Sequence, residues 1–144
     1  MTADELFEKG LALLKADDPL GALSCFEKAY NIKKTPQIQS YLAYCIAAER
    51  GKITEAIAMC HDSLEREPDN PLHYLNLGRI YLKADRKTEA LEVLRRGLSH
   101  GDNQEIKQIL EILGKRKKPI IPFLPRNHFL NKYIGLTLSR LQLR

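Results

Sequence analysis

The chain has 144 residues, of which 44% are hydrophobic and 28% are charged, and its net charge is +5. This length allows one domain with a buried core, and the composition is that of a globular protein. No apolar run approaches the roughly 20 residues that a membrane-spanning helix needs, and the polar start lacks the basic and then apolar pattern of a signal peptide. The sequence therefore predicts a cytoplasmic protein.

Residues 3–104 repeat themselves with a period of 34 residues and without an insertion. The three units are residues 3–36, 37–70 and 71–104. One place in each unit holds a small residue: Ala22, Ala56 and Ala90. A fixed period of this size is typical of helical repeat proteins, in which each unit stacks on the next.

Each unit is predicted to contain two helices. Three of them begin with a capping residue followed by proline, at Asp18-Pro19, Thr35-Pro36 and Asn70-Pro71, which is the order that helix starts favour. The six predicted helices lie near residues 3–16, 18–33, 36–50, 53–66, 70–84 and 87–99.

A seventh helix is predicted from about residue 104 to residue 113. Its apolar stripe consists of Ile106, Ile109, Leu110 and Leu113. The residues expected to face away from the repeats are Glu105, Lys107, Gln108 and Glu111. A helix with one polar face suits the end of a row of repeats, and Gly114 is expected to end it.

The third unit carries a recognisable signature, Tyr74-x2-Leu77-Gly78-x2-Tyr81 followed by Ala90-x3-Leu94. This pattern resembles the tetratricopeptide repeat (TPR) family. The first unit departs from it at Lys9, and the second has Tyr44 where the family has a small residue. The resemblance covers residues 3–104 and implies an all-α fold. That fold is a right-handed α-α superhelix of three helix-turn-helix repeats with a capping helix.

In the TPR family the first helices of the units line a concave surface that holds a peptide or a partner helix. The corresponding residues here are Phe7, Leu11, Leu14, Ile38, Tyr41, Leu42, Cys45, Leu72, Leu75, Asn76 and Arg79. Leu72 and Leu75 are explained equally well by packing between neighbouring helices. Phe7, Leu11 and Tyr41 are harder to explain that way, so an open apolar strip is expected, and such a strip needs a cover.

One TPR subfamily grips the carboxylate-ended tails of heat-shock chaperones with a clamp of Lys, Asn, Asn, Lys and Arg. The matching residues here are Phe7, Leu11, Leu42, Leu72 and Asn76. Since only one of these is polar and none is charged, such a tail is a poor ligand. The resemblance implies a protein-interaction module, an adaptor, scaffold or small chaperone, whose partner is an apolar extended or helical segment.

Residues 114–144 form a basic tail with three prolines between residues 119 and 125 and a predicted short helix at 127–141. It holds eight of the 23 Lys and Arg residues and no acid, whereas residues 1–113 hold the other 15 bases and all 18 acids. The apolar residues predicted to make its contacts are Ile120, Ile121, Phe123, Leu124, Phe129 and Tyr133.

Three interpretations of this tail remain open. In the first, it docks on its own repeats, or it docks on those of a second copy, in which case the chain self-associates. In the second, it lies on an anionic membrane surface and the protein is a peripheral membrane tether. In the third and weakest, it contacts nucleic acid, although no nucleic-acid module accompanies it.

The sequence gives no sign of catalysis, of a metal or of a cofactor. Its three cysteines (Cys25, Cys45 and Cys60) include no CxxC pair, and its four histidines lack metal-ligand spacing. Cys60 and His61 are neighbours, but adjacent helical residues point about 100° apart. No phosphate loop and no GxSxG motif occur. The sequence therefore predicts a binding protein and no enzyme.

Overall fold

The computed structural model describes residues 1–116, and all regular secondary structure within them is helical. The helices in this range are α1 (Ala3–Lys15), α2 (Pro19–Ile32), α3 (Pro36–Arg50), α4 (Ile53–Arg66), α5 (Pro71–Lys83), α6 (Lys87–His100) and α7 (Gln104–Arg116). The first six agree closely with the prediction. The seventh does not end at Gly114, because α7 continues through this residue to Arg116.

The predicted helix starts are confirmed by their capping contacts. The Asp18 carboxylate accepts a hydrogen bond from the backbone N–H of Gly21 at 2.9 Å, and the Thr35 hydroxyl accepts one from Ile38 at 3.2 Å. Asn70 caps α5 in the same way, and a proline stands in the first turn of each of these helices. Each cap satisfies an N–H group that has no partner within the helix, which stabilises it by about 1 kcal/mol.

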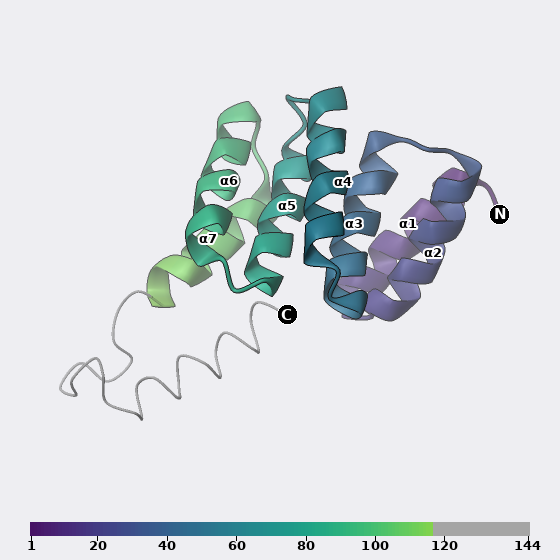
Figure 1. The fold of residues 1–144 in the computed structure, drawn as a ribbon, viewed down its shortest axis with the longest axis horizontal. Helices are drawn as coiled ribbons and strands as arrows, with labels where there is room; N and C mark the ends of the chain where they lie inside the picture. The colour runs from purple at the N-terminus through teal and green to yellow at the C-terminus, as the bar shows by residue number, and fades with distance from the viewer. Residues whose placement is uncertain (117–144) are drawn as a thin grey trace.

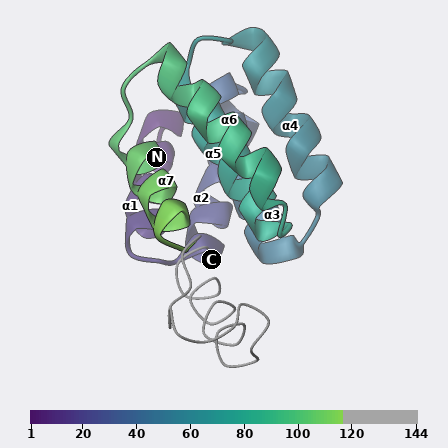
Figure 2. The same cartoon turned by 90° about the vertical axis from the view of Figure 1, so that its left-hand side faces the viewer.

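The helices form pairs that stand side by side in a row (Figure 1). Helix α1 packs on α2, α3 on α4 and α5 on α6, while α3 and α5 connect the second and third pairs. Helix α7 packs on α6 at the end of the row. The view along the row shows α1 and α7 on one side and α4 on the other (Figure 2).

Within the first and third pairs, a glycine lets a large core residue come close to the helix backbone. A Cβ atom on Gly10 would lie 2.4 Å from Cε1 of Phe26, and one on Gly78 would lie 2.5 Å from Cδ2 of Leu94. Both large residues are fully buried. In the second pair Tyr44 replaces the glycine, and small alanines and a cysteine occupy the core beside it, so volume is exchanged within one layer.

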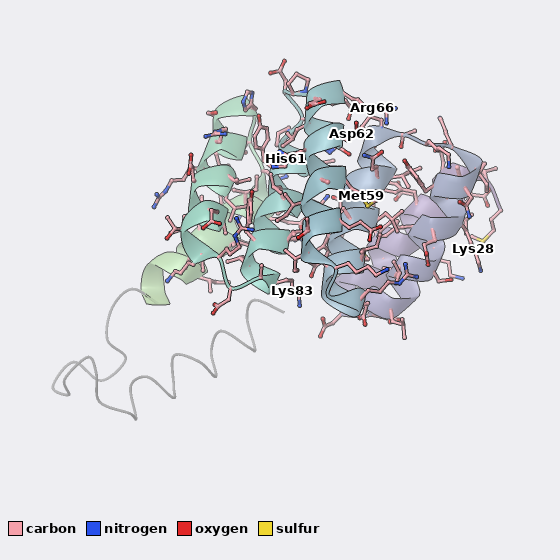
Figure 3. All side chains as sticks on the ribbon, viewed as in Figure 1. Lys28, Met59, His61, Asp62, Arg66 and Lys83 are labelled. Atoms are coloured by element: carbon pink, nitrogen blue, oxygen red, sulfur yellow. The ribbon has the colours of Figure 1, made fainter. Side chains whose placement is uncertain are left out.

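A buried glutamine joins three helices of the first two repeats. Gln39 accepts a hydrogen bond from the Tyr30 hydroxyl at 3.0 Å. Its amide nitrogen donates to the Asp62 carboxylate at 2.8 Å and to the Met59 carbonyl at 2.9 Å; Figure 3 labels both acceptors on α4. Because every polar atom of this buried amide has a partner, the hydrogen bonds offset the cost of desolvating it, and Gln39 ties α2, α3 and α4 together.

The three cysteines are buried free thiols. Burial raises the pKa of Cys45 to about 12, and it also raises the pKa of Cys60. They therefore act as small apolar residues of the core, as the sequence predicts.

In the described part of the chain, each helix is too short or too polar to span a bilayer.

Candidate functional site

A hollow of about 370 Å³ lies on the side of the molecule that α1, α3, α5 and α7 form. The lining residues are Glu8, Leu11, Ala12, Leu14 and Lys15 of α1, Tyr41 of α3, Arg79 of α5 and Glu105 of α7. The first helix of every repeat and the capping helix thus contribute to one concavity. Its volume is at the lower end of the range of ligand pockets, roughly 300–1,000 Å³.

Four residues of the predicted groove line this hollow: Leu11, Leu14, Tyr41 and Arg79. Six others are buried within the described domain itself: Phe7, Ile38, Leu42, Cys45, Leu75 and Asn76. Leu72 is partly buried and packs against two core clusters, one formed by the first two repeats and the other by the third repeat with α7. The predicted groove residues therefore divide into a small lining and the core that supports it.

The expectation that Phe7 and Tyr41 form an open strip is wrong. They are only 8% and 5% exposed. Together with Phe26 they form an aromatic cluster whose ring centroids lie 5.5 to 5.7 Å apart. Burying such rings between α1, α2 and α3 stabilises the first repeat by about 1.5–3 kcal/mol each, so the apolar surface is covered by packing and the hollow has a charged rim.

Arg79 is the best-positioned cation of the hollow. One of its terminal nitrogens, Nη1, donates to Oδ1 of Asn76 at 3.4 Å, and its guanidinium carbon lies 5.3 Å from the ring centroid of Tyr44. The other, Nη2, donates to the Glu105 carboxylate. Glu105 was expected to face away from the repeats; the structure contradicts this, because the turn between α6 and α7 brings it to Arg79.

A buried chain of hydrogen bonds runs from Arg79 to the far end of α5. Asn76 donates from Nδ2 to the Ser40 hydroxyl oxygen at 3.2 Å. His73 Nδ1 lies 2.9 Å from this oxygen, and His73 Nε2 lies 2.7 Å from a Glu67 carboxylate oxygen. Because a carboxylate only accepts, Nε2 carries the proton and Nδ1 accepts from the Ser40 hydroxyl. No spacing in the sequence marks Ser40 or His73 for this role.

The titration of these groups agrees with this assignment. Burial lowers the pKa of His73, although Glu67 opposes the effect, so the imidazole is neutral at neutral pH. The hydrogen bond from His73 lowers the pKa of Glu67, which stays ionised. Burial also raises the pKa of Tyr41 to about 12, against the opposing charge of Arg79. The hollow therefore presents a neutral phenol beside a guanidinium.

Ser40, His73 and Glu67 are joined in this order by hydrogen bonds, which resembles the serine, histidine and carboxylate arrangement of hydrolases. Here Ser40 and His73 are both 0% exposed, so a substrate has no access to the hydroxyl. The chain of hydrogen bonds is structural, joining α3 to α5. Among residues 1–116, no group of three or more metal-ligating side chains could hold an ion.

Paired helices in a row, with a hollow on the side of the first helices, define an α-helical repeat protein. A family model of the tetratricopeptide repeat matches residues 47–113. The TPR domain of Sgt2 from Aspergillus fumigatus has a similar structure, with 22% identity, a TM-score of 0.61 and coverage of 80% of this chain and 78% of that domain. Among curated proteins, no sequence matches this chain.

Yeast Tom70 is a more distant neighbour. It is 19% identical with a TM-score of 0.49, and the match covers 96% of this chain and 34% of that one. This chain therefore spans about a third of that Tom70 chain.

The helix pairs and the structural likeness confirm the all-α helical repeat fold that the sequence predicts, and the tetratricopeptide repeat model matches slightly less than half of the chain. Repeats of this class serve as protein-interaction modules. The predicted tail contacts lie outside the described residues: Ile120, Ile121, Phe123, Leu124, Phe129 and Tyr133.

Proposed function

We propose that the hollow binds a segment of another protein, which makes this chain an adaptor, a scaffold or a small chaperone. The observation that carries the proposal is the make-up of the hollow. Leu11 and Leu14 are partly exposed and offer apolar surface beside the nearly buried Tyr41, and charged side chains from α1, α5 and α7 surround it. Apolar contacts supply affinity and a few placed polar groups fix orientation, as in protein interfaces and ligand sites.

The segment that fits is short and presents one or two large apolar side chains to the hollow. Each such side chain contributes about 1.5–3 kcal/mol when it is fully buried. A micromolar complex needs about 8 kcal/mol after the cost of ordering the segment. Apolar contact alone therefore falls short, and the charged rim has to contribute. The chain's own basic tail is a second candidate occupant of the same hollow.

The proposal can be tested by selecting binders from a displayed library of random peptides on the full-length chain. Ala12 is exposed and lines the hollow, so Ala12→Gln should obstruct it without disturbing the core. Ser24, which is exposed on α2, provides the matched control Ser24→Gln. We expect the selected peptides to bind the wild type and the control equally, and to lose at least tenfold in affinity on Ala12→Gln.

A library that yields no enriched peptide, or peptides that bind Ala12→Gln unchanged, would refute the proposed function. The same peptides measured on residues 1–116 then address the tail. Tighter binding to the shorter chain would show that the tail competes for the hollow, and equal binding would show that it does not.

A further inference from the structure

The guanidinium of Arg79 is held in place from several sides before any partner binds. Its hydrogen-bond acceptor, Asn76, is fully buried and is itself fixed by Ser40. The ring of Tyr44 supports the guanidinium from another side. A buried polar chain of this kind is often no more stable than apolar packing of the same volume. What it achieves here is a preorganised cation, and preorganisation lowers the cost of binding.

Glu105, in contrast, is a loosely held carboxylate. Its side chain is 52% exposed, whereas that of Arg79 is 21% exposed. Helix α7 is anchored by Ile106 and Leu113, which are both fully buried. Because an exposed ion pair contributes little to stability, Glu105 can leave Arg79 without releasing α7.

We propose that Arg79 is the anion anchor of the hollow and that Glu105 occupies it in the free protein. A partner segment binds by placing an Asp or Glu side chain on Arg79 in the place of Glu105, with a large apolar side chain beside it. This inference rests on the proposed function and names the chemistry of the partner. It also identifies Arg79 as the residue that determines specificity.

The charges around the hollow favour a single carboxylate. A guanidinium binds a carboxylate through two parallel N–H groups, which a lysine cannot do. Lys15 adds a second positive charge at the rim, but Glu8 stands on the same helix and opposes a highly acidic segment. The anchor also lies three residues beyond Asn76, outside the places that correspond to the chaperone-tail clamp.

The test uses the full-length chain and peptides selected as above, resynthesised with acetylated and amidated ends so that no terminal carboxylate is present. Each acidic peptide is paired with a version in which Gln replaces Glu. Binding is measured by fluorescence anisotropy to the wild type, to Arg79→Gln and to Glu105→Gln. The exposed residues Arg95 and Glu55, which do not line the hollow, give the controls Arg95→Gln and Glu55→Gln.

We expect the wild type to prefer the Glu peptide over its Gln version by about tenfold or more. Arg79→Gln should abolish this preference. Glu105→Gln should tighten binding of the Glu peptide by a few-fold, because the internal competitor is gone. Both control variants should behave as the wild type does.

Equal affinity of the Glu and Gln peptides for the wild type would overturn the anchor. This comparison needs no protein variant, so it stands even if Arg79→Gln fails to fold. Unchanged or weaker binding by Glu105→Gln would also overturn it, since Glu105 would then only tether α7. In both cases, a loss of peptide affinity on Ala12→Gln would leave the proposed function intact. Peptides that bind Ala12→Gln as tightly as the wild type would refute both the anchor and the proposed function.

Discussion

Replacing a glycine by alanine should have opposite effects at two helical positions of this domain. Gly78 lies in α5, where an added Cβ would be 2.5 Å from Cδ2 and 2.6 Å from Cγ of Leu94. Gly114 lies in α7, and a Cβ there would meet nothing within 4 Å. Both substitutions replace glycine by a better helix former, so the difference between them isolates the packing.

The magnitudes follow from these contacts. Alanine gains about 0.5–1 kcal/mol over glycine within a helix, so Gly114→Ala should stabilise the fold by up to about 1 kcal/mol. At Gly78 the same gain is opposed by overpacking, which costs about 1–3 kcal/mol, because the fully buried Leu94 cannot move away. The two variants should therefore differ by about 1–3 kcal/mol in their free energy of unfolding.

Urea unfolding followed by circular dichroism at 222 nm measures this difference. Leu94→Ala completes a double-mutant cycle: alone it should cost about 2–5 kcal/mol. Combined with Gly78→Ala, it should cost less than the sum, because the new methyl group enters the space that leucine left. If Gly78→Ala stabilises as much as Gly114→Ala does, or if the cycle is additive, the close approach of α5 and α6 does not require glycine.

Three further outcomes follow from the structure. Gly51 ends α3 with φ of 66°, so Gly51→Ala should destabilise by about 1–2 kcal/mol in urea unfolding without any clash, and an unchanged midpoint would contradict the left-handed backbone. The pKa of His73 is lowered from its usual 6.5, so the unfolded chain binds the proton more readily and stability is lost as pH falls below about 6.5. His73→Gln should flatten this dependence, and parallel pH profiles would show that another group causes it. The thiols of Cys45 and Cys60 should react with Ellman's reagent only as fast as the domain opens, because they are buried and their pKa values are raised; rapid labelling of the native protein would disprove that burial.

Of the candidate site, the sequence predicted Leu11, Leu14, Tyr41 and Arg79 as members of a groove, and the structure places all four around one hollow. Leu11 and Arg79 lie two periods of 34 residues apart, and equivalent places of stacked units face the same way. Leu14 and Tyr41 hold other places on the first helices of their units, and the family resemblance predicted them as groove residues. Their exposure could not be predicted in the same way. The ring of Phe7 packs against the ring of Tyr41 and helps to bury it. This burial depends on how closely α1 and α3 approach each other.

The helices were determined by the sequence itself, for reasons that act over a few residues. Each capping side chain binds an N–H group two or three residues away, and proline is tolerated only in the first turn. The 34-residue period then requires every unit to bury the same face, so the row of helix pairs follows from the spacing alone. These signals are local and periodic, which is why Pro19, Pro36 and Pro71 mark helix starts correctly.

Only the tertiary structure determined the polar contacts of the site. Ser40 and Asn76 are 36 residues apart, and Arg79 and Glu105 are 26 apart. Neither separation belongs to the repeat, so no pattern in the sequence joins these residues. Their meeting depends on the crossing of α3 with α5 and on the turn before α7. A shift of about 1 Å in either would break these hydrogen bonds, whereas the helices themselves would remain.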